Sequence, residues 1–265
     1  MKRPTELRAA WPALAKRLKA AHAVAVMLDF DGTLAPIVPH PDQARLPRRT
    51  RAALQRLRQR PKVEVGIVSG RSLADVRERV GLAGLHYVGS HGLEWQGPTG
   101  KGRLRVKAGA RAAMRKIGEV LKAQLKEFQG LYVEQKTTSV TVHYRNASAA
   151  EAEQAGRMVR YFLRASGNSL RLLAGKKVWE LLPPGAMDKG RAVKAEVKRL
   201  ARQTGTRPVV IYLGDDVTDE KVFARLGRDD LGVHVGAGER TKARYRLAGP
   251  TAVARFLDKL AEAMR

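Results

Sequence analysis

Short apolar runs alternate with amphipathic stretches along much of this chain. Three runs are almost entirely apolar, as expected for strands that are buried on both faces of a parallel sheet: 23–28, 63–68 and 209–213. Four stretches carry apolar residues at helical spacing: 5–21, 50–60, 72–80 and 189–203. Strands therefore alternate with helices, and the pattern predicts an α/β fold with a Rossmann-like parallel-sheet core.

The middle of the chain follows a different pattern. A Gly/Pro-rich segment, 96–102, predicts a loop and a domain boundary. Beyond it, helical and strand-like segments follow one another in the order αββαββ: 114–128, 131–135, 139–144, 149–165, 170–173 and 178–182. Pro183-Pro184-Gly185 ends this series. We therefore expect a core domain of residues 1–106 and 185–265, interrupted by an inserted α+β cap domain of residues 107–184.

An acidic pair follows the first predicted strand. Asp29 and Asp31 lie in the segment Leu28-Asp29-Phe30-Asp31-Gly32-Thr33, and strand alternation would place both side chains on one side of the chain. One carboxylate could attack phosphorus while the other protonates the leaving oxygen and later activates water. The alternative interpretation is an Asp-Gly turn in which Asp31 only caps a turn or helix.

A second acidic cluster follows the strand at 209–213. Asp215, Asp216, Asp219 and Glu220 lie within six positions, in a chain with 51 Lys and Arg against 25 Asp and Glu. Hard oxygen ligands of this kind suit Mg²⁺, with Asp215 nearest the strand end and Asp219 one helical turn later. The alternative is an acidic first turn that the helix dipole favours.

Two further segments suggest a phosphate site. Ser69-Gly70-Arg71 follows the second predicted strand, where a hydroxyl and backbone amides can bind phosphate. The alternative is an ordinary strand-to-helix turn in which Ser69 is only the N-cap. Lys189 stands where the α/β pattern resumes and could neutralise phosphate. His91 is a possible neighbour of the site.

The net charge of +26 favours attraction of anions, including nucleic acid. The basic residues are spread along the chain and only 5% of residues are aromatic, so we expect no specific nucleic-acid partner. No stretch reaches the roughly 18 apolar residues of a membrane span, and we expect a cytoplasmic monomer without a membrane partner. Zero cysteines exclude disulfides and thiolate catalysis.

Taken in order, these motifs resemble those of the haloacid dehalogenase-like phosphatases with a C2-type cap. The resemblance implies that Asp29 is a nucleophile that forms an aspartyl-phosphate, and that Asp31 is the general acid and base. It implies phosphate binding by Ser69, Gly70 and Lys189. It also implies a Mg²⁺ site formed by Asp29, the backbone carbonyl of Asp31, and Asp215, with Asp219 supporting it.

Finer features resemble the trehalose-6-phosphate phosphatases over nearly the whole chain, including Gly89-Ser90-His91-Gly92 and 139–145. This resemblance implies hydrolysis of trehalose 6-phosphate to trehalose and phosphate. The substrate-binding residues that we expect are Arg71, His91, Glu134, Lys136, Arg145, Lys176 and Glu180. Departures such as Gln135 between Glu134 and Lys136 affect the sugar contacts. Two alternatives remain: a phosphatase for sucrose phosphate or a hexose phosphate, and a basic polyanion-binding protein.

Overall fold

The computed structural model describes residues 3–136, 138–175, 177–238 and 240–265. They form two compact units, a core unit of residues 3–103 with 187–265 and an insert unit of residues 104–186. Among the described residues, no helix has the length and apolar character needed to cross a membrane. Lys176, one of the expected substrate-binding residues, lies outside the described residues.

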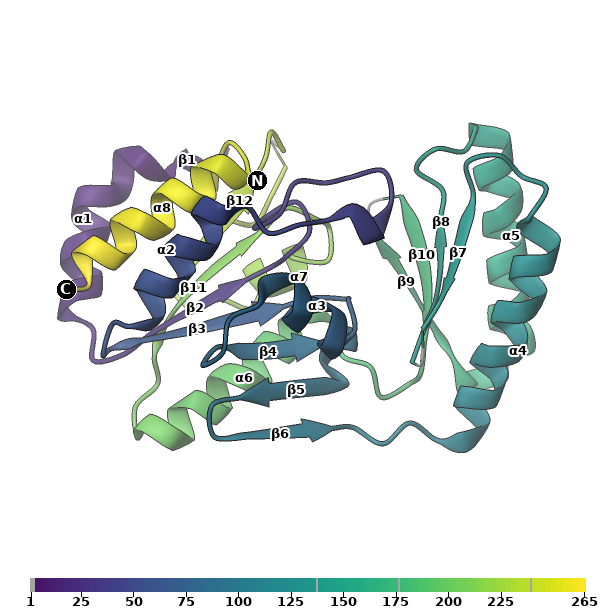
Figure 1. The fold of residues 1–265 in the computed structure, drawn as a ribbon, viewed down its shortest axis with the longest axis horizontal. Coiled ribbons are helices and arrows are strands. Elements are labelled where there is room, and N and C mark those ends of the chain that lie inside the picture. Colours follow the sequence, from purple (N-terminus) through teal and green to yellow (C-terminus); the bar gives the residue numbers. More distant parts are fainter. Residues whose placement is uncertain (1–2, 137, 176, 239) are drawn as a thin grey trace. The chain divides into compact units, whose positions relative to one another are not determined.

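The core unit is an α/β structure around one nine-stranded sheet (Figure 1). In chain order its elements are β1 (Thr5–Glu6), α1 (Leu7–Ala20), β2 (Val24–Leu28), η1 (Pro41–Gln43), α2 (Arg48–Arg58), β3 (Val63–Val68), α3 (Leu73–Val80), β4 (His86–Gly89), η2 (Ser90–Gly92), β5 (Glu94–Gly97), β6 (Gly100–Arg103), α6 (Lys189–Thr204), β11 (Val209–Gly214), α7 (Glu220–Phe223), β12 (Leu231–Val235), β13 (Tyr245–Leu247) and α8 (Pro250–Ala263). The predicted Rossmann-like core is thereby confirmed.

The sheet is parallel except at one edge. Its strand order is β1-β13-β12-β11-β2-β3-β4-β5-β6, and every pair from β1 to β4 is parallel. Only β5 and β6 join antiparallel. The carboxyl ends of β2 and β11, which are neighbours in register, therefore meet at one edge of the sheet.

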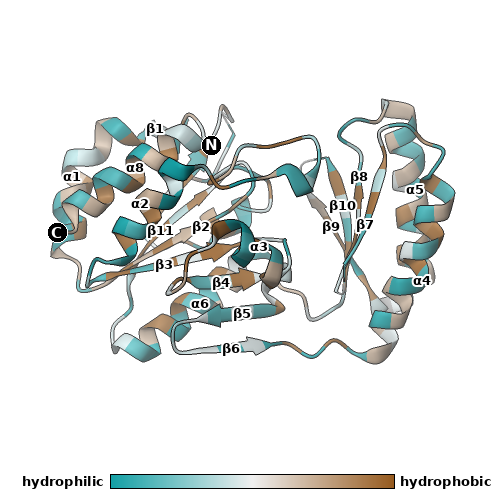
Figure 2. Cartoon of the chain, in the orientation of Figure 1, coloured by the Kyte–Doolittle hydropathy of each residue, from teal (hydrophilic) through white to brown (hydrophobic). Residues whose placement is uncertain are grey.

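Alternation along β2 explains why helices cover both faces of the sheet. Val24, Val26 and Leu28 pack with α1, α2, α3 and α8 on one face, whereas Ala25 and Met27 pack with α6 and α7 on the other. A strand that is buried on both sides needs apolar residues at every position. Figure 2 shows this as brown colouring along the central strands.

The prediction of a loop at 96–102 is wrong, because this segment forms most of the hairpin β5–β6, with its turn at Pro98-Thr99. Glycine content lowered its apparent strand propensity. Trp95 compensates for the missing side chain of Gly102 on the paired strand. Its ring covers this glycine so closely that a Cβ there would overlap the indole. The side chain of Arg199 stacks on the same ring at 4.6 Å from its centroid.

The insert unit is a small α+β structure in the predicted αββαββ order. Its elements are α4 (Ala108–Leu125), β7 (Tyr132–Gln135), β8 (Val140–His143), α5 (Ala149–Ala165), η3 (Gly167–Ser169), β9 (Arg171–Gly175) and β10 (Val178–Leu182). The antiparallel sheet has the order β7-β8-β10-β9. Met114, Ile117 and Leu121 of α4 are buried, and α4 and α5 pack against the sheet. A capping box of Ser148 and Glu151 begins α5 at the predicted residue.

Candidate active site

The carboxyl edge of the core sheet brings two acidic segments together. Strand β2 ends at Leu28 and is followed by Asp29, while β11 ends at Gly214 and is followed by Asp215. Because β2 and β11 pair in register, the amide of Asp29 donates to the carbonyl of Leu213 at 3.0 Å. This is the edge at which open α/β sheets bind ligands.

Lys189 joins the two acidic segments. It is the first residue of α6, whose N-terminus is capped by the carboxylate of Asp188. Its ammonium contacts Asp29 Oδ1 at 2.7 Å and Asp219 Oδ1 at 2.8 Å, and the lysine and both carboxylates are buried. Each of the two buried carboxylates thus has a charged partner, and both share the one ammonium.

Asp219 is held by further hydrogen bonds. The hydroxyl of Tyr212 donates to Asp219 Oδ1 at 2.6 Å, and the amide of Asp216 donates to Oδ2 at 2.9 Å. Sequence reasoning missed Tyr212, whose signal was a hydroxyl-bearing side chain within the apolar strand β11. These bonds fix the position of Asp219 and hence of Lys189.

Three carboxylates could hold a metal ion. Asp29, Asp215 and Asp219 each offer an oxygen atom, and these atoms lie within 4.8 Å of one another. An all-oxygen, anionic donor set fits a hard divalent cation such as Mg²⁺. Glycines allow this approach, because a Cβ at Gly32 would collide with the Asp215 carboxylate and one at Gly214 would collide with that of Asp219.

The electrostatics of the cluster also fit a cation. Burial raises the pKa of the Asp29 carboxyl well above its usual range; Lys189 opposes this shift, and the charges of Asp219 and Asp215 add to it. Three carboxylates beside one ammonium leave an excess of negative charge. A bound cation would offset that excess and favour the ionised, nucleophilic form of Asp29.

Asp31 occupies a different environment. The strand ends before it, so the alternation that we expected to align Asp29 with Asp31 does not apply. Asp31 instead forms an isolated bridge with Ala35, and the guanidinium of Arg71 binds its carboxylate at 2.7 Å through both Nε and Nη2. Its side chain is 42% exposed. A carboxylate held this way is oriented and accessible.

The Ser69-Gly70-Arg71 segment lies directly after β3. The buried Ser69 hydroxyl accepts a hydrogen bond from the amide of Arg71 at 3.1 Å, and the helix that follows is capped by Ser72, not Ser69. His91 has a left-handed φ of 52°. Its ring lies so close to Gly70 that a Cβ there would be 2.9 Å from it. The structure therefore places His91 beside the predicted phosphate loop.

Three of the expected sugar-binding residues, Glu134, Lys136 and Glu180, lie close together in the insert. Glu134, Thr141 and Glu180 are directly opposite one another on β7, β8 and β10, so their side chains share a face. Lys136 is 3.4 Å from Glu134 and 3.8 Å from Glu180. Arg145 is exposed after β8.

His143 is a second residue that the sequence analysis did not assign to the site. Its Nε2 is 3.0 Å from Glu134 Oε2. Burial opposes ionisation of Glu134, but His143 and Lys136 outweigh it and lower the pKa of this carboxyl. Glu134 therefore presents an ionised acceptor.

Comparisons with known proteins identify the family of this chain. Residues 27–251 match the trehalose-phosphatase family. The chain is 39% identical over 251 residues to trehalose-phosphate phosphatase of Mycobacterium bovis, a match that covers 92% of this chain and 63% of that protein. The chain therefore spans less than two thirds of that relative's length.

Solved structures support the fold. The C-terminal domain of Candida albicans trehalose-6-phosphate phosphatase has a TM-score of 0.84 at 24% identity, covering 98% of each chain. A haloacid dehalogenase-like hydrolase from B. subtilis has a TM-score of 0.60 at 18% identity, covering 88% of this chain and 98% of that one. With the family match over most of its length, this chain belongs to the trehalose-phosphatase family.

Proposed function

We propose that this protein is a Mg²⁺-dependent phosphatase that hydrolyses trehalose 6-phosphate to trehalose and inorganic phosphate. The observation that carries the proposal is the buried cluster of Asp29, Lys189 and Asp219 with Asp215 at the carboxyl edge of the sheet. Family membership supports the same activity. The proposal includes the cytoplasmic, monomeric state expected from the sequence.

In the proposed reaction, Asp29 attacks phosphorus and forms an aspartyl-phosphate while Asp31 gives a proton to the departing sugar oxygen. Asp31 then takes a proton from water, which attacks the phosphorus, breaks its bond to the Asp29 oxygen, and so releases phosphate and the free Asp29 carboxylate. Lys189 and Ser69 hold the phosphoryl oxygens. Mg²⁺, held by Asp29, Asp215 and the backbone carbonyl of Asp31, would neutralise charge on the phosphoryl group. Asp219 supports this site by fixing Lys189.

The polar face of the insert is proposed to bind the sugar hydroxyls. Glu134, Lys136 and Glu180 provide charged partners. The buried hydroxyl of Thr141 lies between the two glutamates in register and has no hydrogen-bond partner among the described residues. An unpaired buried hydroxyl costs about 1–3 kcal/mol, and a sugar hydroxyl could satisfy it. Arg145, Lys176, Arg71 and His91 complete the proposed set.

Phosphate release from trehalose 6-phosphate, sucrose 6-phosphate, glucose 6-phosphate and p-nitrophenyl phosphate tests the proposal. Trehalose 6-phosphate should give the highest kcat/KM, and a chelator should stop turnover until Mg²⁺ is restored. Asp29→Asn should remove activity because an amide cannot form the intermediate, while Asp229→Asn, at an exposed carboxylate, should not. Substantial turnover by Asp29→Asn would refute the nucleophile, and preference for another sugar would refute the substrate.

A further inference from the structure

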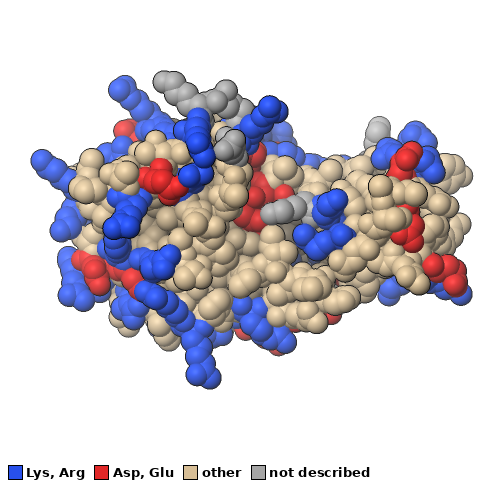
Figure 3. Space-filling model, turned by 90° about the horizontal axis from the view of Figure 1, so that it is seen from above, with Lys and Arg blue, Asp and Glu red and all other residues tan. Residues whose placement is uncertain are grey.

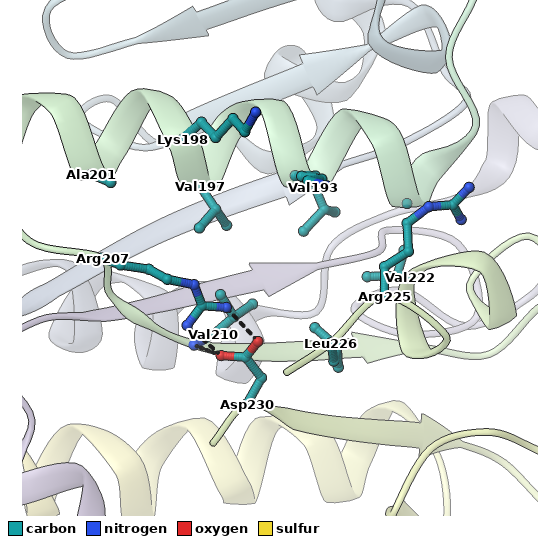
Figure 4. A pocket seen from close by; sticks show the side chains of 12 residues that line it. Val193, Val197, Lys198, Ala201, Arg207, Val210, Val222, Arg225, Leu226 and Asp230 are labelled. Atoms are coloured by element: carbon teal, nitrogen blue, oxygen red, sulfur yellow. Dashed lines mark hydrogen bonds and ion pairs between the residues drawn. The ribbon is translucent and has the colours of Figure 1, made fainter. Parts of the chain in front are cut away.

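A cavity of about 300 Å³ lies in the core unit against α6, and the proposed reaction does not use it (Figure 4). Its interior is apolar, with Val193 and Val197 of α6 facing Val222 and Leu226. Both valines of α6 are more than nine-tenths buried. The volume is at the lower end of the range of about 300–1,000 Å³ that small-molecule sites occupy.

The rim of the cavity is basic. Lys194, Lys198, Arg207 and Arg225 line it, with Asp230 as the acidic residue among the lining side chains. The charge of Asp230 is already satisfied: its carboxylate accepts from Arg207 at 2.6 and 3.2 Å. It also accepts from the backbone amides of Val210 and Gly227. Figure 4 shows the Arg207–Asp230 pair opposite α6.

Two lysines at the rim are not neutralised in this way. Lys194 and Lys198 are exposed and one helical turn apart, and no ion pair is found for either among the described residues. Like charges at this spacing lower the stability of a helix. An anion bound near both ammonium groups would relieve that repulsion, and it would form charge-assisted hydrogen bonds.

From this combination we propose that the cavity binds a small amphipathic anion: one apolar chain or ring with a single carboxylate or sulfonate group. The apolar part would fill the space between α6 and Val222 and Leu226, and the anionic group would lie at Lys194 and Lys198. An inorganic anion would leave the apolar wall unfilled. A neutral apolar molecule would leave the lysines uncompensated.

The occupant would contact both helices that flank the catalytic ion pair. Gly190 lines the cavity directly after Lys189, and α6 is so close to α7 there that a Cβ at Gly190 would collide with the carbonyl of Lys221. Val222 also lines the cavity, and its amide donates to the carbonyl of Asp219 at 2.8 Å. The residues that line the cavity are therefore different from those of the active site, but α6, and α7 with its N-cap residue Asp219, contribute to both.

Binding can be tested on the whole protein with the fluorescent sulfonate 8-anilinonaphthalene-1-sulfonate and with octanoate as its competitor. Octanoate should displace the dye, octanol should do so more weakly, and saturating inorganic phosphate should not displace it. Lys194→Glu/Lys198→Glu should weaken octanoate binding by about tenfold or more, since it removes the charge-assisted contacts. The matched pair Lys16→Glu/Lys259→Glu, at exposed lysines of α1 and α8, should bind as the wild type does.

A second variant tests the apolar part. Ala201→Leu adds side-chain volume at the cavity lining and should weaken the binding of octanoate and of octanol alike. In the wild-type protein, bound octanoate should slow amide hydrogen exchange in residues 193–201 and 222–226. The proposal is overturned if octanol competes as well as octanoate, if phosphate displaces the dye, or if Lys194→Glu/Lys198→Glu binds normally. Protection confined to other segments would overturn it as well.

Discussion

Neighbouring side chains on β7 point to opposite faces of the insert sheet and have separate roles. Glu134 points to the polar face with Thr141 and Glu180. Gln135 lies against Gly118 of α4, and its amide donates to the carbonyl of Arg115 at 3.3 Å. The unusual glutamine between Glu134 and Lys136 is therefore a contact to the helix layer and leaves the polar face unchanged.

Glu180→Ala should reduce kcat/KM for trehalose 6-phosphate by about 10- to 150-fold, because a hydrogen bond to a charged group contributes about 1.5–3 kcal/mol. p-Nitrophenyl phosphate lacks the sugar, so its hydrolysis should change little. Glu153→Ala, at an exposed glutamate of α5, is the control. Steady-state kinetics on both substrates decide the matter: equal losses on both would show that Glu180 does not recognise the sugar.

His86 should make the stability of the core unit depend on pH. The ring is buried, with Nε2 2.8 Å from Glu64 and Nδ1 3.0 Å from Glu196, and Arg199 lies 2.9 Å from Nδ1. Burial lowers the pKa of His86, but the two glutamates outweigh burial and raise it above 6.5. The folded state thus holds this proton more tightly than the unfolded state does.

The resulting stabilisation is complete below a pH of about 6.5, the unfolded pKa. It is lost as the pH rises through the higher folded pKa. Urea unfolding between pH 6 and pH 9 should therefore show a falling free energy of unfolding, with a smaller slope for His86→Gln than for the wild type. His22→Gln, at an exposed histidine, should keep the wild-type slope. An unchanged slope in His86→Gln would rule out this role.

At the level of elements, the contact of α6 with α7 depends on glycine. Replacing glycine by alanine inside a helix usually stabilises it by about 0.5–1 kcal/mol. Gly190→Ala should do the reverse, because its Cβ would collide with the backbone carbonyl of Lys221. Gly109→Ala in α4, where an added Cβ would have open space beyond the helix's own backbone, should be neutral or stabilising. Thermal unfolding of both variants checks this, and a Gly190→Ala protein as stable as wild type would contradict it.

Elements with one strong local pattern could be predicted from sequence. Val63–Val68, Ala149–Ala165 and Val178–Leu182 were predicted to the residue. The hairpin β5–β6 could not be predicted, because its glycines are supported by Trp95 from the paired strand. Strands β12 and β13 were not assigned at all. Local periodicity predicts elements well where each strand or helix has enough apolar residues of its own.

The same distinction applies to the candidate site. The resemblance to the haloacid dehalogenase-like phosphatases implied that Asp29 and Asp215 share one metal site, and the structure brings the two carboxylates together. The pairing of Arg71 with Asp31 and of Tyr212 with Asp219 could not be predicted, because each bond depends on where the chain turns after a strand ends. Composition shows which side chains are available, and the tertiary structure selects their partners.

At the scale of the whole molecule, the excess of positive charge comes from basic residues that are spread along the chain. Figure 3 shows Lys and Arg scattered over one face of the protein without a single continuous patch. We therefore expect duplex DNA to bind weakly, without sequence preference, and with an affinity that falls steeply between about 50 and 200 mM salt. Fluorescence anisotropy with two unrelated duplexes measures this. A sequence-selective complex that persists at the higher salt would favour the polyanion-binding alternative.

The placement of the insert within the chain also determines the order in which the protein can fold during synthesis. The central strand pair of the core, β2 with β11, joins segments on opposite sides of the insert, whereas every strand pair of the insert is internal to it. Contacts between distant segments form slowly, and the ribosome releases the N-terminal segment first. The insert can therefore complete its sheet while β2, which can already pair with β3, still lacks β11, so the nascent core depends on a late step that the insert does not share.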